Sequence, residues 1–274
     1  MRNWSLLYIV MAVLSVIVCI YAPFDPNWRL PPNVSTTGRE VDHLFELIMG
    51  ITGLTFVGVS IAFGIAAWKF TDAPGRKAKY MHGSQRLEIV WTVIPAGILV
   101  FIALYQMGTW TKIKFRSEAP RVQPIAEVSA RQFQWLMVYP GPDGRLHTPD
   151  DLHTVNDLHF VKGKPALIYL KSQDVIHSFF LPQMRIKQDA LPGMTIPVWF
   201  DSDTASTSEH PFELVCAELC GWGHYKMRSK VVVHETQAEF DEWVKQSLKE
   251  QNRDQLKSAK TTTAAVEHKG GESL

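Results

Sequence analysis

The stretch 216-CAELCGWGHYKM-227 places two cysteines, a histidine and a methionine in one short segment, with the spacing Cys-x3-Cys-x3-His-x2-Met. Two cysteines this close form a disulfide in many exported domains, but a disulfide has no need of His224 or Met227. Zinc accepts thiolate and imidazole, whereas a thioether is a poor ligand for zinc. Thiolate, imidazole and thioether together indicate copper.

A single blue-copper site uses one cysteine and two histidines, so it would leave one thiolate of this segment over. Two coppers bridged by both thiolates use every one of these side chains, provided that a second histidine comes from elsewhere. His177, in 174-DVIHSFFLP-182, follows the apolar pattern 166-ALIYL-170 and can supply it. We expect the other histidines of this region to be surface or turn residues, namely His147, His153, His159, His210 and His234.

The first part of the chain contains three uncharged apolar stretches, at residues 3–24, 47–68 and 89–111. Each exceeds the roughly 20 residues that a helix needs to cross a bilayer. Residues 113–248 alternate apolar and polar positions and contain many prolines and glycines, which predicts a β-rich domain. Residues 249–274 are polar and rich in lysine, glutamate, glutamine and threonine, so we expect a disordered tail.

The loop 69-KFTDAPGRKAKYMHGSQR-86 decides the topology, because its lysines and arginines are opposed only by Asp72. By the positive-inside rule this loop is cytoplasmic. Residues 43–111 then form a transmembrane helical hairpin, and the domain after residue 112 lies outside the cytoplasm. Gly58, Ala62 and Ala66 form a small-residue stripe, which serves either close helix packing or lipid contact.

Residues 1–24 are either a signal peptide or a first transmembrane helix. One positive charge before a long apolar run suits both. Pro23 directly after Ala22 disfavours cleavage there, so we favour a retained helix.

Three segments now point to a known family: 86-RLEIVWTVIPAGILV-100, 174-DVIHSFFLPQMRIKQDALPG-193 and 216-CAELCGWGHYKM-227. Over most of its length the chain resembles subunit II of the haem–copper cytochrome c oxidases. The first segment is similar to the family's second transmembrane helix and the other two to its copper-binding segments. The resemblance implies a membrane-anchored all-β fold, in which an N-terminal helical hairpin precedes a cupredoxin-like β-barrel.

The resemblance also implies a binuclear copper centre, called copper A. Carried over residue by residue, its ligands are His177, Cys216, Glu218, Cys220, His224 and Met227. The two cysteines would bridge the coppers, Met227 would be a weak axial ligand, and Glu218 would ligate through its backbone carbonyl. In the family the carboxylate of this glutamate also helps to hold a magnesium ion shared with subunit I, a role that suits a hard oxygen ligand.

The segment 131-RQFQWLMVYP-140 resembles the family's aromatic stretch, through which electrons arrive from cytochrome c. Phe133 stands where the family usually has a tryptophan. On a strand, Phe133 and Trp135 would share a face, and both could equally be barrel packing. We therefore expect Trp222 or Tyr225 of the copper loop to take part in docking the donor.

Glu88, in 84-SQRLEIVW-91, begins the last apolar stretch. A glutamate here is favoured by the helix dipole and by the membrane interface. The resemblance implies a second role, at the mouth of the lysine proton channel of subunit I.

The implied protein is subunit II of a terminal oxidase in a bacterial inner membrane, with its copper domain on the periplasmic side. It would pass electrons from a cytochrome c-like donor to haem in subunit I, where oxygen is reduced and protons are pumped. The implied partners are subunits I and III, the donor and membrane lipid, while the net charge of +1 gives no indication of nucleic-acid binding. The alternative is a membrane-anchored copper-binding or assembly protein without an oxidase partner.

Overall fold

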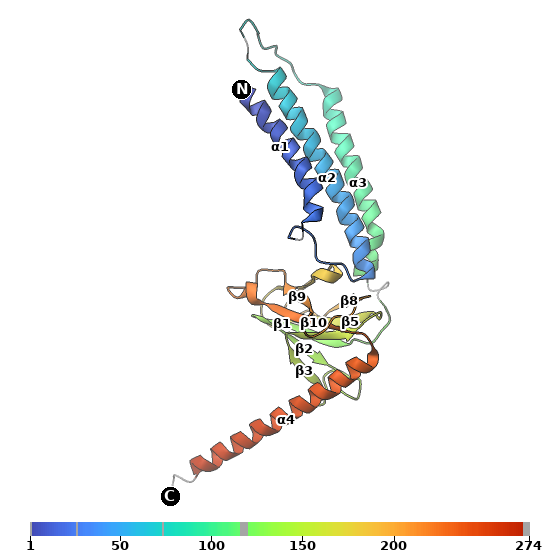
Figure 1. The fold of residues 1–274 in the computed structure, drawn as a ribbon, viewed down its shortest axis with the longest axis vertical. Helices are drawn as coiled ribbons and strands as arrows, with labels where there is room; N and C mark the ends of the chain where they lie inside the picture. The colour runs from blue at the N-terminus through green and yellow to red at the C-terminus, as the bar shows by residue number, and fades with distance from the viewer. Residues whose placement is uncertain (1, 26, 73, 116–119, 271–274) are drawn as a thin grey trace. The chain divides into compact units, whose positions relative to one another are not determined.

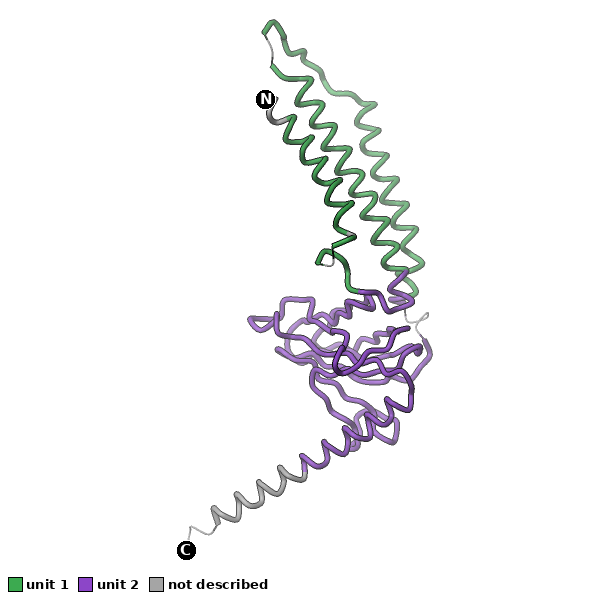
Figure 2. The backbone as a smooth tube through the Cα atoms, viewed as in Figure 1, with its two compact units in different colours: residues 1–31, 40–112 green, residues 32–39, 113–274 purple. Residues whose placement is uncertain are grey.

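The structure of the protein is a computed structural model, which describes residues 2–25, 27–72, 74–115 and 120–270 (Figure 1). The chain divides into two compact units, which Figure 2 distinguishes by colour. The first unit comprises residues 1–31 and 40–112, and the second comprises residues 32–39 and 113–274. Each unit is described by itself below.

The first unit is helical. Its elements are α1 (Arg2–Tyr21), the short 3-10 turn η1 (Ala22–Phe24), most of α2 (Thr36–Lys69) and nearly all of α3 (Gln85–Lys114). Helices α2 and α3 are long and apolar enough to cross a membrane. They coincide with the predicted hairpin, and the prediction of two membrane-spanning helices before a β domain is confirmed.

Helix α1 approaches α2 closely at Gly64. A Cβ atom added to Gly64 would lie 3.0 Å from the Ile9 side chain, so a larger residue there would require that side chain to shift. At the adjacent positions, the rings of Tyr8 and Phe63 stack at 5.6 Å. Gly58, the first residue of the predicted small-residue stripe, does not contact α1, because a Cβ atom added to it would meet nothing within 4 Å.

The second unit is built on two five-stranded sheets, with strand orders β3-β2-β1-β5-β8 and β4-β10-β9-β6-β7. The first sheet contains β1 (Ala126–Arg131), β2 (Gln134–Tyr139), β3 (Leu152–Val155), β5 (Ala166–Ser172) and β8 (Ile196–Phe200). The second contains β4 (Asp157–Val161), β6 (His177–Leu181), β7 (Ile186–Ala190), β9 (Phe212–Cys216) and β10 (Arg228–His234). Each sheet has one parallel pair, β1 with β5 and β4 with β10.

The core lies between the two sheets. Along β2, Trp135, Met137 and Tyr139 are buried while the residues between them are half-buried, the period of two expected of a strand. From the other sheet, Phe179 meets the Trp135 ring edge-on at 5.8 Å. Buried aromatic side chains of this size each contribute about 2 kcal/mol or more.

The connection before α2 belongs to the β unit, although the sequence placed this domain at residues 113–248. Val34 is buried in the core, its N–H donates to the carbonyl of Gln183 at 3.0 Å, and its carbonyl accepts from the N–H of Asp203 at 2.8 Å. The hydroxyl of Ser35 donates to the carboxylate of Asp201 at 2.6 Å. These contacts join residues far apart in sequence, which periodicity alone does not reveal.

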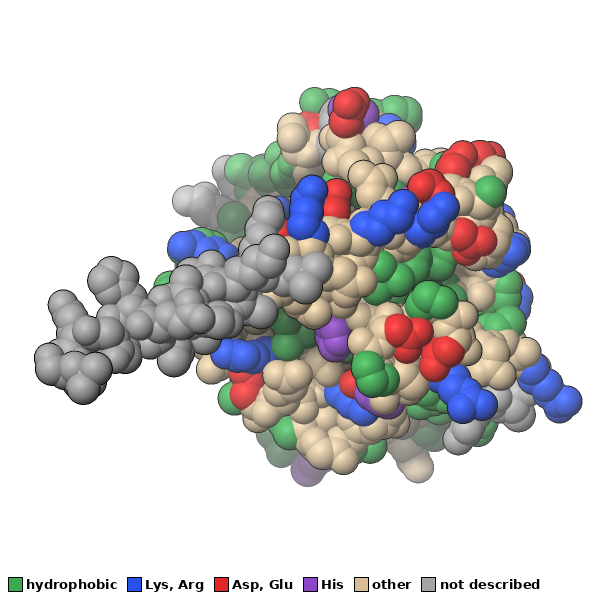
Figure 3. All heavy atoms as spheres, turned by 90° about the horizontal axis from the view of Figure 1, so that it is seen from below, with side chains coloured by type: hydrophobic (Ala, Val, Ile, Leu, Met, Phe, Trp, Pro, Cys, Tyr) green, Lys and Arg blue, Asp and Glu red, His purple; other side chains and the backbone are tan. Residues whose placement is uncertain are grey.

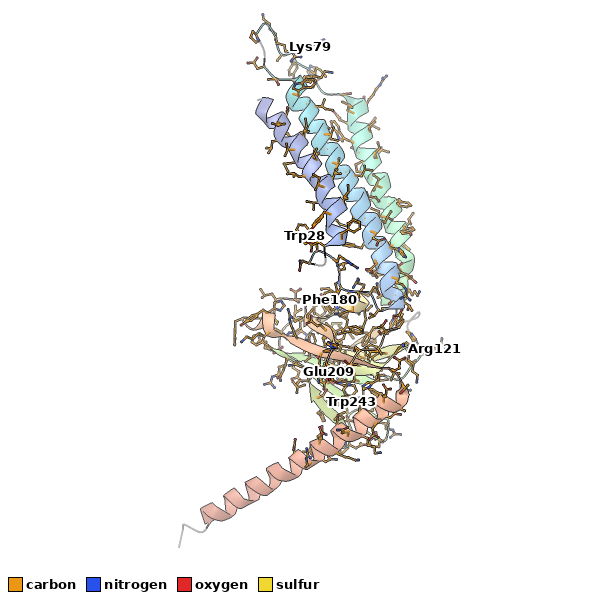
Figure 4. All side chains as sticks on the ribbon, in the orientation of Figure 1. Trp28, Lys79, Arg121, Phe180, Glu209 and Trp243 are labelled. Atoms are coloured by element: carbon orange, nitrogen blue, oxygen red, sulfur yellow. The ribbon has the colours of Figure 1, made fainter. Side chains whose placement is uncertain are left out.

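Helix α4 (Gln237–Gly270) follows the last strand. Its first turns pack on the two sheets of the second unit and carry Trp243, which is labelled in Figure 4. The Trp243 ring meets Tyr139 edge-on at 5.1 Å and stacks on His159 at 3.7 Å. The helix continues through residues 249–270, where the sequence predicted a disordered tail, and residues 271–274 of that tail lie outside the described residues. Lysine, glutamate, glutamine and alanine are good helix formers, so a helix that begins by docking can propagate through them.

Two of the histidines expected at the surface are not there. His159 is buried, with Nε2 2.7 Å from a carboxylate oxygen of Asp157 and Nδ1 2.9 Å from Nε2 of His234, which is half-buried. His147, His153 and His210 are exposed, as expected.

On the face seen in Figure 3, acidic and basic side chains lie in small mixed groups.

Candidate metal centre

The segments that carry the predicted copper ligands meet because β6 and β9 are neighbouring strands. His177 begins β6 and Cys216 ends β9, and the antiparallel pairing sets Phe179 opposite Cys216. Just beyond the pair, the N–H of Ala217 donates to the carbonyl of Ser178 at 3.0 Å. Strand pairing thus brings one histidine to the start of the cysteine-bearing loop.

The loop then turns back through the 3-10 turn η3 (His224–Lys226) into β10. The Sγ atoms of Cys216 and Cys220 lie 3.9 Å apart. Nδ1 of His177 lies 3.9 Å from the first sulfur and Nδ1 of His224 lies 3.6 Å from the second. Sδ of Met227 completes the group, 3.8 Å from Sγ of Cys220.

The two cysteines do not form a disulfide, because a bonded pair would have its sulfurs about 2.05 Å apart. Both are free and buried. The carbonyl oxygen of Glu218 lies 3.2 Å from Sγ of Cys216, and the residue itself is exposed. The structure therefore brings together all six residues predicted as copper ligands, the glutamate through its backbone.

The pKa values of the two thiols move in opposite directions. Burial favours the neutral thiol of Cys216, but hydrogen bonds, chiefly with His177, outweigh it and lower the pKa to about 6. At Cys220 burial and the neighbouring charge of Cys216 raise the pKa to about 12. A bound metal ion would stabilise the thiolate form of both sulfurs.

Asp174 orients His177 and was not among the residues singled out from the sequence. Its carboxylate lies 2.7 Å from Nε2 of His177, which leaves Nδ1 facing the sulfurs. Burial alone would lower the pKa of His177, but hydrogen bonds with Cys216 and Asp174 raise it. Metal-binding histidines commonly have such a partner on the second ring nitrogen.

The donor set fits copper. The buried group of His177, Cys216 and Cys220 has its ligand atoms within 4.8 Å of one another, and it contributes sulfur and nitrogen without a carboxylate side chain. Thiolate and thioether are soft ligands, whereas magnesium and calcium prefer oxygen. A second imidazole and a thioether at the same place provide enough donors for two copper ions.

Comparison with protein families agrees with this geometry. Residues 23–108 match the transmembrane domain of cytochrome c oxidase subunit II, and residues 129–236 match the periplasmic domain of the same subunit. The chain belongs to the cytochrome c oxidase subunit II family. It is a membrane protein with a periplasmic, cupredoxin-like β domain, and the copper A-binding domain of the family spans the whole candidate centre.

Individual relatives of this subunit II chain are of moderate identity. It is 30% identical over 264 residues to alternative cytochrome c oxidase subunit 2 of Bradyrhizobium diazoefficiens, covering 88% of this chain and 91% of that protein. It is 27% identical over 273 residues to cytochrome c oxidase subunit 2 of Thermostichus vulcanus, covering 80% and 78%. The solved periplasmic domain of subunit II of Bradyrhizobium japonicum is 25% identical, with a TM-score of 0.42 over 48% of this chain and 98% of that one.

The aromatic residues of this subunit II differ in accessibility. Trp135 is fully buried, so it cannot touch a donor, and its ring lies 6.3 Å from that of His177. Phe133 lies in the turn between β1 and β2, so the expectation that it shares a strand face with Trp135 is wrong. Trp222 and Tyr225 are 81% and 67% exposed, and Phe133 meets the Trp222 ring edge-on at 5.3 Å.

Glu88 is exposed in the first turn of α3, and its N–H donates to the carbonyl of Ser84 at 3.0 Å. This is the place expected of a carboxylate that interacts with a helix dipole. Its role in a proton channel stays a prediction.

Proposed function

We propose that this subunit accepts electrons singly from a cytochrome c-like donor and delivers them to haem in subunit I of a cytochrome c oxidase, where oxygen is reduced and protons are pumped. The observation that carries the proposal is the convergence of Cys216 and Cys220 with two imidazoles and a thioether, mostly buried, at one end of the barrel. Such a site relays electrons and needs no acid–base or substrate-binding groups.

His177, Cys216, Glu218, Cys220, His224 and Met227 would hold copper A. When bound, that centre supplies a one-electron relay whose charge is shared by two metal ions. The barrel keeps the ligands in place: His177 and Met227 are almost fully buried, at 0% and 1% exposure, and their close-packed surroundings cannot rearrange freely. Ligands held rigidly in this way reorganise little when the charge changes.

Glu218 suits a second, hard ion between subunits. Its carbonyl faces the copper ligands while the residue is exposed, so its carboxylate is free to reach outward. One carboxylate cannot complete a magnesium site, and subunit I would supply the remaining ligands.

The donor would dock over the copper loop. Trp222 and Tyr225 are exposed there, and Phe133 supports the first of them. Exposed aromatic residues of this kind are common anchors at protein interfaces. Trp135 would act only from the core, as packing beside His177.

The proposed domain arrangement keeps α1 as a transmembrane helix. Its close approach to α2 at Gly64 and the stacking of Tyr8 on Phe63 support this assignment. Subunits I and III would cover further apolar faces of the helices, and Glu88 would stand at the mouth of the proton channel of subunit I.

Purification of the tagged chain from its native membrane tests the proposal. We expect a haem-containing subunit to co-purify and the complex to oxidise reduced cytochrome c with uptake of oxygen. A copper-loaded chain that purifies without haem would instead favour a copper-binding assembly protein, for which family membership gives no support.

A further inference from the structure

The turn between β1 and β2 touches both segments that carry copper ligands. The backbone N–H of Gln132 donates to one carboxylate oxygen of Asp174 at 2.7 Å, and the other carboxylate oxygen lies 2.7 Å from Nε2 of His177. The side-chain amide of Gln132 donates to the backbone carbonyl of Cys220 at 2.5 Å. One residue thus joins the first histidine ligand, through Asp174, to the second cysteine ligand.

The copper loop is seated closely on this turn. A Cβ atom added to Gly223 would lie 2.5 Å from the Phe133 ring, and one added to Gly221 would lie 2.8 Å from the Gln132 amide nitrogen. Gly221 also has a φ of +136°, a conformation that other residues rarely adopt. The loop therefore lies against the turn in a conformation that favours glycine at both positions.

Building on the proposed function, we propose that Gln132 is a positioning residue for the copper centre. Its two hydrogen bonds fix the Cys220 backbone relative to Asp174 and so to His177, before any metal binds. The ligands of one copper pair come from strands β6 and β9 and from a loop. The second half of that loop is held by its own backbone hydrogen bonds and by the N–H of Cys216, which donates to the carbonyl of Met227 at 3.1 Å. Gln132 adds a restraint from outside the loop, at the carbonyl of Cys220.

The restraint depends on the donor atoms of the glutamine side chain. Glutamate has the same length but presents an acceptor, so in Gln132→Glu two oxygens would face each other at the Cys220 carbonyl. Alanine removes the contact without adding repulsion. Gln134 lies two residues along the same hairpin, and the structure shows no side-chain hydrogen bond from it, so Gln134→Ala is a matched control.

The test uses the full-length chain loaded with copper. Release of copper to an excess of chelator is followed by the loss of visible absorption, and the EPR spectrum is recorded before release. A single partly exposed hydrogen bond corresponds to about a fivefold effect on an equilibrium. We expect Gln132→Ala and Gln132→Glu to start with the wild-type copper content, to release copper about fivefold or more faster, and to show altered copper hyperfine structure. Gln134→Ala should match the wild type.

Release rates in both Gln132 variants within twofold of Gln134→Ala, with an unaltered spectrum, would overturn the proposal. So would a raised KM for the donor as the sole change, because Gln132 would then belong to the docking surface. Failure of both variants to fold would also contradict it, since the residue would then support the barrel and not the ligands.

A second measurement separates this proposal from the proposed function. In the copper-free chain, a thiol reagent should modify Cys220 faster in both Gln132 variants than in Gln134→Ala, because the loop is less restrained. If the wild-type chain bound no copper pair, the proposed function would fail while this comparison still decided the role of Gln132. Equal thiol reactivity in all variants would overturn the positioning role.

Discussion

Nε2 of His177 lies 2.7 Å from a carboxylate oxygen of Asp174, and the opposite ring nitrogen faces Sγ of Cys216 at 3.9 Å. The carboxylate therefore decides which nitrogen is presented to a metal. It also places a negative charge one imidazole away from the copper ligands, where it stabilises the more positive, oxidised state of a bound metal.

Replacing Asp174 by asparagine should raise the reduction potential of the copper centre and speed copper release several-fold, because a charge is lost and the hydrogen bond to His177 weakens. A redox titration followed by visible absorption measures the first effect and a chelator challenge the second. Asp241→Asn, on the exposed face of α4, is the control. An unchanged potential together with unchanged release would show that Asp174 does not act on the centre.

Truncation of the exposed aromatic residues should impair donor docking. We expect Trp222→Ala or Tyr225→Ala to cost about 2 kcal/mol, which is a roughly 30-fold rise in KM for reduced cytochrome c. Phe133→Ala should have a smaller effect, through the support it gives to Trp222. Steady-state oxidation by the purified complex, at constant copper content, measures all three. If only Phe133→Ala impairs electron input, docking over Trp222 and Tyr225 is wrong.

The paired histidines beneath α4 should make the β unit sensitive to acid. Burial and the neighbouring His159 lower the pKa of His234 from its ordinary value of 6.5, while Glu239 and Asp157 oppose this without reversing it. Since the unfolded chain then binds more protons than the folded one, stability is full above pH 6.5 and falls as the pH drops from 6.5 toward the lowered pKa.

The variant His234→Gln keeps an N–H donor for His159 and removes the titration. Its melting temperature should fall less between pH 7.5 and pH 5.5 than that of the wild type, by roughly 2 °C. His153→Gln, at an exposed position, should behave like the wild type. An equal loss in all three proteins would mean that His234 does not carry the acid sensitivity.

Glu88→Gln should slow proton delivery without disturbing copper. Oxidase turnover should fall several-fold while the visible spectrum of the copper centre stays unchanged, because Glu88 and the copper ligands lie in separate units of the chain. Asp72→Asn, in the same cytoplasmic loop region, serves as the control. Turnover that is unaltered across pH would leave Glu88 as an interfacial charge only.

The copper ligands could be predicted from the sequence because most of them lie in one loop, where spacing fixes which side chains can meet. Only His177 had to come from elsewhere, and its position after the apolar pattern 166–170 indicated it, whereas its place as the first residue of β6 is known only from the structure. The helical hairpin was equally predictable, since a membrane span requires about 20 apolar residues in a row.

What the sequence did not reveal depends on contacts between distant residues. Gln132 is unremarkable in its own segment, and its partners Asp174 and Cys220 lie 42 and 88 residues away. Val34 precedes a membrane helix but is buried in the barrel core. The sequence around His159 has the pattern of a strand, but that pattern does not reveal that Trp243 from α4 stacks on the His159 ring and covers it. Trp135 is buried as barrel packing, one of the two alternatives that the sequence left open, while Phe133 lies in the turn and not on the strand.

The most direct test of the central claim is copper stoichiometry combined with EPR on the purified full-length chain. We predict two coppers per chain and a signal from one unpaired electron shared by both metal ions. Cys216→Ser and Cys220→Ser should each abolish this signal, whereas Met227→Leu should keep the stoichiometry and shift the potential, since an axial thioether tunes the centre more than it holds it. One copper per chain with the EPR signal of an isolated cupric ion would contradict the account.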